Sequence, residues 1–330
     1  MTGKMTFTDP TLPSTLGRLV VGRRRETEVL VAALAAGRHV LLEGPPGTGK
    51  STLLRALAEG AGLDFELVEG NAELTPARLV GHHDPSRVMA EGYSPDIFVE
   101  GPLALAMREG SLLYVEEINR VPEETLNVLI TVMSEAELNV PRLGRISAAK
   151  GFRLVAAMNP FDAVGTARIS SAIYDRTCRI LMGYQEAEEE VEIVRRGVEP
   201  VSAPQEWMAK VVDLVRLTRR HPDIRVGSSV RGALDTVMVA AALAELRGRR
   251  PTDPQVGLDA AMAALSGRIR IHEGSGRTAE QIVTDLWEQV FGRARDGGWS
   301  EQAPEDGEAE EEAEGGAEGS GEGKAKAPPA

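Results

Sequence analysis

Alternating apolar and polar stretches in the first half of the chain predict a sheet with helices on both of its faces. Five short β-rich runs alternate with helical patterns between residue 16 and about residue 184. Most of these runs are apolar on both faces, which is typical of parallel strands that are covered on both sides. The predicted strands are 38–43, 64–68, 111–115, 152–158 and 177–182.

Two helical patterns stand out between these runs, at 50–59 and 122–135. The second has a proline, Pro122, in its first turn, where proline is well tolerated. It also carries an apolar stripe at helical spacing, formed by Leu126, Leu129, Ile130 and Met133. Strands that alternate with helices in this way predict an α/β sheet.

The β pattern disappears from about residue 185 to residue 297, and helical periodicity replaces it. Prolines separate the helical segments, which we predict at 207–219, 229–246, 253–266 and 278–291. The chain therefore has four predicted parts. These are a flexible N-terminus (1–15), an α/β domain (16–184), a small helical domain (185–297) and a disordered acidic tail (298–330).

The charge of the chain is concentrated in this tail. The 330 residues include 37 Lys and Arg against 50 Asp and Glu, a formal net charge of −13, and residues 300–330 alone hold ten acids and two lysines. Residues 301–330 contain no Ile, Leu, Val or aromatic residue, so burial cannot offset the entropy of ordering them. The tail is either a solvating segment or an acidic interaction arm. The acidic balance argues against a general nucleic-acid coat protein, although a local basic patch stays possible.

Cysteine content and hydropathy indicate which classes of protein, such as disulfide-bonded, secreted or membrane-spanning ones, do not fit the sequence. The single cysteine, Cys178, excludes an intramolecular disulfide and a Cys-rich zinc site, and we expect it to be a small buried residue in a strand. Residues 1–13 lack the apolar core of a secretory signal, and no apolar run approaches the ~18 residues that a membrane span needs. We therefore expect a cytoplasmic protein.

A glycine-rich loop follows the first predicted strand and precedes a predicted helix. Its sequence, Gly44-Pro-Pro-Gly-Thr-Gly-Lys-Ser51, fits the pattern Gly-x4-Gly-Lys-Ser of phosphate-binding loops. Glycines let successive backbone N–H groups surround phosphate oxygens, and the helix N-terminus adds its positive end. We expect Lys50 to reach the β- and γ-phosphates and the Ser51 hydroxyl to ligate Mg²⁺.

Polar residues end two further predicted strands. Glu116 and Glu117 follow the apolar run Leu112-Leu-Tyr-Val115, and Asn159 follows the strand at 152–158. Nucleotide hydrolysis needs carboxylates both for Mg²⁺ and for the attacking water. We predict that Glu116 lies toward the metal, that Glu117 polarises water, and that the Asn159 amide orients water or contacts the γ-phosphate.

Five motifs together resemble the AAA+ ATPases and, among them, the MoxR family. The segments that are similar to family motifs are Phe98-Val-Glu-Gly-Pro-Leu103, Glu116-Glu-Ile-Asn-Arg120, Ala156-Ala-Met-Asn-Pro160, Asp175-Arg176 and Gly227-Ser-Ser-Val-Arg231. The resemblance runs from about residue 16 to residue 270 and leaves out the acidic tail. It implies a five-stranded αβα domain with a helical lid, the nucleotide between them, and a ring of subunits, usually six.

The resemblance also implies roles for individual residues. Asn159 is the first sensor, Arg231 the second sensor on a lid helix, and Arg176 the arginine finger that acts on the ATP of a neighbouring subunit; with Glu117 these are the candidate catalytic residues. ATP and Mg²⁺ are the implied cofactors, with Ser51 and Glu116 as metal ligands. The implied nucleotide-binding residues are Val21, Gly22, Gly44, Pro45, Pro46, Gly47, Thr48, Gly49, Lys50, Ser51 and Thr52.

Two inserted segments and a departure at position 116 also bear on the comparison with the family. Residues 81–101, with His82 and His83, resemble the insert after the second strand, and we expect these histidines on a mobile, solvent-exposed loop rather than at a metal. Residues 137–152 resemble a β-hairpin that faces the pore or a partner in related rings. Glu116 stands where the family prefers Asp, and its extra methylene could shift the coordination of Mg²⁺.

Three functions remain in competition. The first is an ATP-hydrolysing ring that remodels or assembles protein partners, which the family resemblance pairs with a von Willebrand A domain protein. The second is a DNA-directed motor. It is disfavoured because no zinc module, winged-helix pattern or basic arm follows the predicted lid. The third is a nucleotide-gated assembly scaffold with little turnover, which the glutamate at position 116 suggests.

Overall fold

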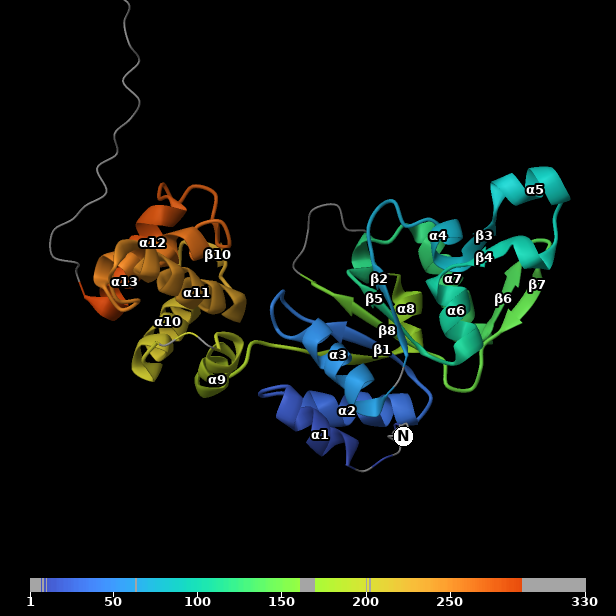
Figure 1. Ribbon diagram of the computed structural model, residues 1–330, viewed down its shortest axis with the longest axis horizontal. Helices are drawn as coiled ribbons and strands as arrows, with labels where there is room; N and C mark the ends of the chain where they lie inside the picture. The colour runs from blue at the N-terminus through green and yellow to red at the C-terminus, as the bar shows by residue number, and fades with distance from the viewer. Residues whose placement is uncertain are drawn as a thin grey trace, which may run out of the picture. The chain divides into compact units, whose positions relative to one another are not determined.

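The computed structural model describes residues 7, 9, 11–62, 64–160, 170–199, 201 and 203–292. The predicted acidic tail therefore lies outside the described residues. A five-stranded parallel sheet forms the centre of the first part of the chain (Figure 1). Its strands are β1 (His39–Glu43), β2 (Phe65–Glu69), β5 (Leu112–Glu116), β8 (Arg153–Met158) and β9 (Thr177–Leu181). All five predicted strands are confirmed to within about one residue at each end.

The order of the strands across the sheet is β2-β5-β8-β1-β9. Because β1 lies between β8 and β9, segments that are far apart in sequence become neighbours. The helices and short 3-10 turns of this part are α1 (Leu12–Leu19), α2 (Arg24–Ala35), α3 (Lys50–Ala61), α4 (Pro76–Val80), α5 (Pro85–Glu91), η1 (Pro95–Ile97), α6 (Pro102–Glu109), η2 (Ile118–Arg120), α7 (Glu123–Glu135) and α8 (Ser171–Arg176).

Alternate residues of the central strands enter two separate hydrophobic cores. On β1, Val40 and Leu42 pack with the residues of α1, α2 and α3, whereas Leu41 packs with those of α4, α6 and α7. Successive side chains of a strand point to opposite faces, so the apolar runs of the sequence cover both faces of the sheet. The predicted α/β fold, an αβα sandwich, is confirmed.

A second group of helices follows the last strand of the sheet. It contains α9 (Ala187–Gly197), α10 (Gln205–Thr218), α11 (Val230–Arg247), α12 (Pro254–Leu265) and α13 (Ala279–Phe291). Buried residues of all five helices form a hydrophobic core of their own, in which Trp287 is 1% exposed. The prediction of an all-helical region is wrong in one detail, because β10 (Ile224–Val226) pairs antiparallel with β11 (Arg270–Ile271). Runs of two or three residues are too short to show a β pattern in sequence.

Two further predictions are wrong, one about the N-terminal segment and one about the burial of Cys178. Helix α1 begins at Leu12, inside the predicted flexible N-terminus, because Leu12 and Leu16 are completely buried. Cys178 lies in β9 as predicted, but its side chain is exposed. The reason is that β9 is an edge strand, where Leu181 is also 61% exposed.

The two inserted segments pack against each other. Strands β6 (Glu137–Val140) and β7 (Gly144–Ser147) form the predicted hairpin, and the Arg142 guanidinium in its turn lies 3.8 Å from the ring centre of Tyr93. The other insert contains β3 (Gly81–His83) paired with β4 (Phe98–Glu100). His83 is half-buried in this strand between Tyr93 and Phe98, so the exposed-loop prediction is wrong for His83 and correct only for the exposure of His82.

Within the described ranges, no cluster of three or more His, Cys, Asp or Glu side chains is arranged to hold a metal ion. The same residues contain no helix that is both long enough and apolar enough to cross a membrane.

Candidate functional site

Three of the predicted motifs meet at the carboxyl edge of the sheet. The glycine-rich loop leaves the end of β1, Glu116 ends β5, and Asn159 follows β8, which lies between β1 and β5. The Gly44 N–H donates to the carbonyl of Met158 at 3.2 Å, which ties the start of the loop to the residue before Asn159. The sequence order separates these residues by up to 115 positions, and the parallel topology brings them together.

The glycines of the loop are required by its shape. Gly47 and Gly49 have φ values of +74° and +85°, a region that favours glycine. A Cβ at Gly44 would collide with the carbonyl oxygen of Met182, and one at Gly47 would collide with the hydroxyl of Ser229. The loop is therefore packed closely against its neighbours and curls in the way that phosphate-binding loops require.

Lys50 is the first residue of α3 and its ammonium lies inside the loop. Nζ donates to the carbonyls of Gly44 at 2.8 Å and Pro45 at 2.9 Å. Burial is the main cause that lowers the pKa of Lys50 to about 8, and the positive charges of Arg231 and Arg23 add to it, while Glu116 and Glu117 oppose it. An ammonium that is poorly solvated and close to other cations gains strongly from a bound anion.

Ser51 and Glu116, the two predicted metal ligands, are in direct contact. The Ser51 hydroxyl donates to Oε1 of Glu116 at 2.5 Å, and the Tyr114 hydroxyl lies 3.3 Å from the same Ser51 oxygen. Mg²⁺ prefers oxygen ligands and is usually held by one or two protein side chains together with phosphates and water. The hydroxyl and the carboxylate fit that donor set.

Glu117 stands beside this pair with an unusual backbone conformation. Its φ of +53° is uncommon for a residue with a side chain, and its carboxylate forms an ion pair with Arg120 at 3.0 Å. The neighbouring strand end leaves room for it only because Gly70 has no side chain, since a Cβ there would lie 2.5 Å from the Glu117 carbonyl oxygen. Strained residues of this kind cluster at functional sites.

The structure brings Arg231 to the loop and keeps Arg176 away from it. Arg231 lies in the first turn of α11, and its Cγ would be 3.9 Å from a Cβ at Gly47. Arg176 ends α8 just before β9 begins, and its Nε donates to Ser134 Oγ at 2.5 Å. Thr177 pairs with His39 at the start of β1. Arg176 therefore lies at the amino ends of the strands, whereas the loop lies at their carboxyl ends.

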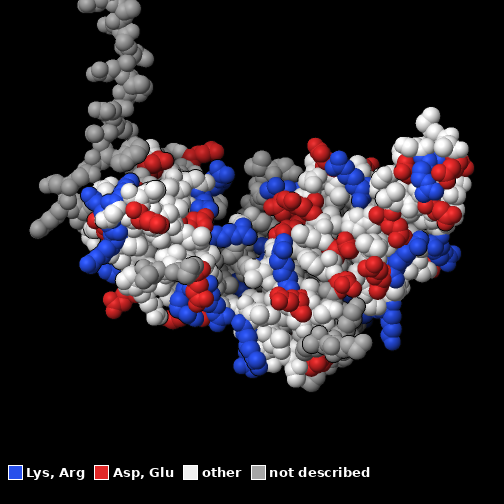
Figure 2. Space-filling view, in the orientation of Figure 1, with Lys and Arg blue, Asp and Glu red and all other residues white. Residues whose placement is uncertain are grey.

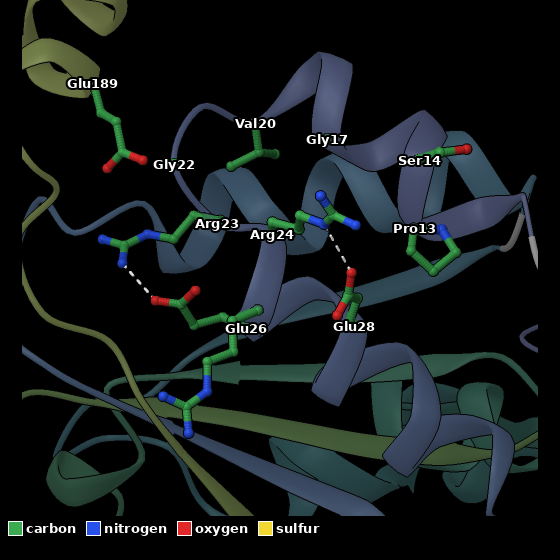
Figure 3. Close-up of a pocket in the computed structure, with 11 residues that line it drawn as sticks. Pro13, Ser14, Gly17, Val20, Gly22, Arg23, Arg24, Glu26, Glu28 and Glu189 are labelled. Carbon is green, nitrogen blue, oxygen red and sulfur yellow. Dashed lines mark hydrogen bonds and ion pairs between the residues drawn. The ribbon is translucent and has the colours of Figure 1, made fainter.

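The remaining predicted nucleotide residues occupy different settings. Thr48 is completely buried, whereas Pro46 and Thr52 are exposed, and Val21 is half-buried. Gly22 lines a cavity of about 970 Å³ between α1, α2 and α9, into which Glu189 projects (Figure 3). A Cβ at Gly22 would collide with the Glu189 carboxylate.

Two arginines near the loop were missed by the sequence reasoning. Arg179 on β9 makes a bidentate ion pair with Glu43, the residue before the loop, at 2.6 and 2.8 Å. Arg23 is 3% exposed and donates to the carbonyl of Thr48 at 2.8 Å. Sequence pattern held only a weak signal for either, namely an arginine directly after Gly22 and a polar residue inside an apolar strand.

We expect the substitution Gly47→Ala to weaken nucleotide binding at least tenfold, because both the left-handed φ and the contact with Ser229 oppose a side chain. Gly92→Ala is the matched control, because its φ is +76° and no atom of the described part of the chain lies within 4 Å of the added Cβ. The dissociation constant of a fluorescent ADP analogue measures the effect. Equal affinities in the two variants would show that the collision with Ser229 does not matter.

Comparison with known proteins agrees with this geometry. The AAA domain of the dynein-related subfamily matches residues 39–177. An RuvB Holliday junction branch migration motor of Thermotoga maritima has a similar fold, with a TM-score of 0.50 and 17% identity over 76% of this chain and 74% of that one. Residues 39–177 therefore match an AAA domain, and the fold is that of the AAA+ proteins.

Three relatives indicate which group of AAA+ proteins the chain resembles. The chaperone MoxR1 of Mycobacterium tuberculosis is 27% identical over 287 residues, 76% of this chain and 73% of that protein. The gas vesicle ATPase GvpN of Haloferax mediterranei is 31% identical over 211 residues, 59% of this chain and 60% of that protein, and the uncharacterized YeaC of Bacillus subtilis is 29% identical over 304 residues, 83% and 92%. The resemblance to the MoxR family of AAA+ ATPases that the motifs predict is confirmed.

Proposed function

We propose that this protein hydrolyses ATP to ADP and phosphate at the carboxyl edge of its sheet. The observation that carries the proposal is the contact between Ser51 and Glu116, 2.5 Å apart beside a buried Lys50. A phosphate loop, a hydroxyl and a carboxylate in this arrangement are what Mg·ATP requires. The match to the AAA domain supports the same conclusion.

Each residue then has a distinct task. Lys50 and the loop N–H groups bind the phosphates, and Ser51 and Glu116 hold Mg²⁺, which neutralises charge on the phosphate oxygens when bound. Glu117 polarises the attacking water, and Asn159 orients it. The ion pair of Glu117 with Arg120 is exposed on both sides, at 38% and 41%, so the carboxylate can leave it at little cost.

Hydrolysis in this proposal takes place between subunits of a ring, most simply a hexamer. Arg176 lies at the edge of the sheet that is opposite its own loop, so it can act only on the nucleotide of a neighbouring copy. Arg231 reaches the loop of its own chain. A guanidinium stabilises the charge that develops on the transferring phosphoryl oxygens.

The ring would act on protein partners, by remodelling or assembling them, in the cytoplasm. Two relatives carry names that point this way, a chaperone and a gas vesicle ATPase. A partner with a von Willebrand A domain is the family expectation. A DNA-directed motor is less well supported, because basic and acidic side chains are interspersed on the face drawn in Figure 2 and the chain carries a net charge of −13.

We expect Glu117→Gln to keep the affinity for ATP and to lose at least 99% of turnover, because the amide cannot accept a proton from water. Glu124→Gln, in the first turn of α7, is the matched control and should be unchanged. Equilibrium binding and phosphate release measure the two quantities. A Glu117→Gln variant with wild-type turnover would remove Glu117 from the mechanism.

The same variant offers a way to find the protein partner. A protein that is captured by the ATP-loaded Glu117→Gln variant but not by Lys50→Ala would be the partner.

A further inference from the structure

Arg23 connects three separate segments through one buried guanidinium. It follows Gly22 and directly precedes α2, and its side chain is 3% exposed. One terminal nitrogen, Nη2, donates to the carbonyls of Thr48 at 2.8 Å and Gly183 at 2.5 Å, and the other, Nη1, donates to Glu26 at 2.8 Å. These partners belong to the phosphate loop, to the link between β9 and α9, and to α2.

Through its hydrogen bond to the Thr48 carbonyl, Arg23 orients the phosphate loop without itself binding a phosphate. In a trans peptide the C=O and the following N–H point in opposite directions. A Thr48 carbonyl held toward Arg23 therefore points the Gly49 N–H away from Arg23, and Gly49 is the N-cap of α3 with a φ of +85°. Backbone N–H groups of this loop are the phosphate ligands of the proposed site.

The contact with Gly183 extends the connection toward the helices. Gly183 follows the end of β9 and lies four residues before α9 begins at Ala187. The same nitrogen thus holds a loop carbonyl and a carbonyl of the segment that leads into α9. Any change in the Thr48 peptide on nucleotide binding must alter a hydrogen bond shared with Gly183.

A contribution to the stability of the fold does not by itself explain why an arginine is buried at position 23. Nε of Arg23 is buried and has no hydrogen-bond partner among the residues that the structure describes. A desolvated guanidinium with an unsatisfied donor is costly, and an apolar side chain of similar size would avoid that cost. Neighbouring Arg24 provides a contrast, because it extends in the other direction, is 92% exposed and pairs with Glu28 at 3.0 Å (Figure 3).

We propose that Arg23 is a positioning residue that links the phosphate loop to the Gly183 segment, so that nucleotide binding is transmitted to α9. The proposal rests on the nucleotide site described above. It adds to that site a residue that sets the loop conformation and reports its occupancy.

The test uses two variants of Arg23. Arg23→Gln keeps one donor group but is shorter and uncharged. Arg23→Lys keeps the charge but replaces the planar guanidinium fork with a single ammonium, so the contacts with Thr48, Gly183 and Glu26 cannot all keep their geometry. Arg24→Gln is the matched control. Amide hydrogen exchange at residues 44–51 and 183–190 is measured on the full chain, with and without saturating Mg·ADP, beside the dissociation constant for ADP. We expect about tenfold weaker binding in both Arg23 variants. At saturation, ADP should slow exchange at 44–51 in all proteins, but at 183–190 only in the wild type and Arg24→Gln.

Nucleotide-induced protection of residues 183–190 that is equal in the wild type and both Arg23 variants would overturn the proposal while leaving the nucleotide site intact. A wild-type protein that binds no ADP would overturn the site itself, and this inference with it. If Arg23→Gln does not fold, the Arg23→Lys variant still decides between these outcomes. A merely structural role predicts a lower unfolding temperature with transmission to 183–190 unchanged.

Discussion

Lys50→Ala is expected to reduce ATP turnover to background and to weaken ATP binding by a factor of ten or more. The ammonium is buried in the loop and donates to two loop carbonyls. We expect it to reach the β- and γ-phosphates of bound ATP from this position. Alanine removes that cation and leaves the backbone of the loop in place. Phosphate release and equilibrium binding of a fluorescent ATP analogue measure the two effects.

The pH dependence of binding gives the same prediction a second test. Burial lowers the pKa of Lys50 to about 8, so the amine of the free protein is charged below that pH and neutral above it. ATP affinity of the wild type should therefore fall as the pH rises through 8, and this decline should be absent in Lys50→Ala. Lys150→Ala, at an exposed lysine before β8, is the control. Wild-type affinity and turnover in Lys50→Ala would refute the assignment of the loop.

Arg176→Ala is expected to bind ATP normally and to hydrolyse it about 10³-fold more slowly. Arg176 precedes Thr177, which pairs with His39, whereas the loop follows Glu43 four residues further along β1. At about 3.3 Å per residue, the start and end of the strand are roughly 13 Å apart. Arg176 also donates to Ser134 and to the Ala172 carbonyl, so it is held at the far edge of the sheet. We therefore expect Arg176 to act on the nucleotide of a neighbouring copy.

Mixing two inactive variants separates a trans effect from a local one. A Lys50→Ala subunit supplies an intact Arg176, and an Arg176→Ala subunit supplies an intact loop, so mixed rings should recover part of the wild-type rate. Arg78→Ala, at an exposed arginine paired with Glu73, serves as the control for removal of a positive charge. Wild-type hydrolysis by Arg176→Ala alone would exclude the arginine finger.

The sheet and the centre of the site could be predicted because local pattern and topology agree there. Strand β5 is buried apart from its last residue, Glu116, so the sequence pattern and the end of the strand coincide. Parallel strands place their carboxyl ends at one edge, which is why the predicted pair of Ser51 and Glu116 is found in contact. The glycines of the loop carry their own conformational signal.

The errors arose where packing over long sequence distances decides the outcome. Cys178 looks like a core residue in an apolar strand, but only the order of the strands shows that β9 is an edge. His83 is half-buried because Tyr93 and Phe98 surround it. The bonds from Arg23 to Thr48 and Gly183 span 25 and 160 residues, and no local pattern marks such pairs.

Phosphate release by the purified wild-type protein, with Mg·ATP and over a range of protein concentrations, tests the central claim most directly. The account predicts release that depends on magnesium, that rises per subunit as rings assemble, and that Lys50→Ala abolishes. Release no greater than that of Lys50→Ala, at concentrations where sedimentation shows assembled rings, would contradict it.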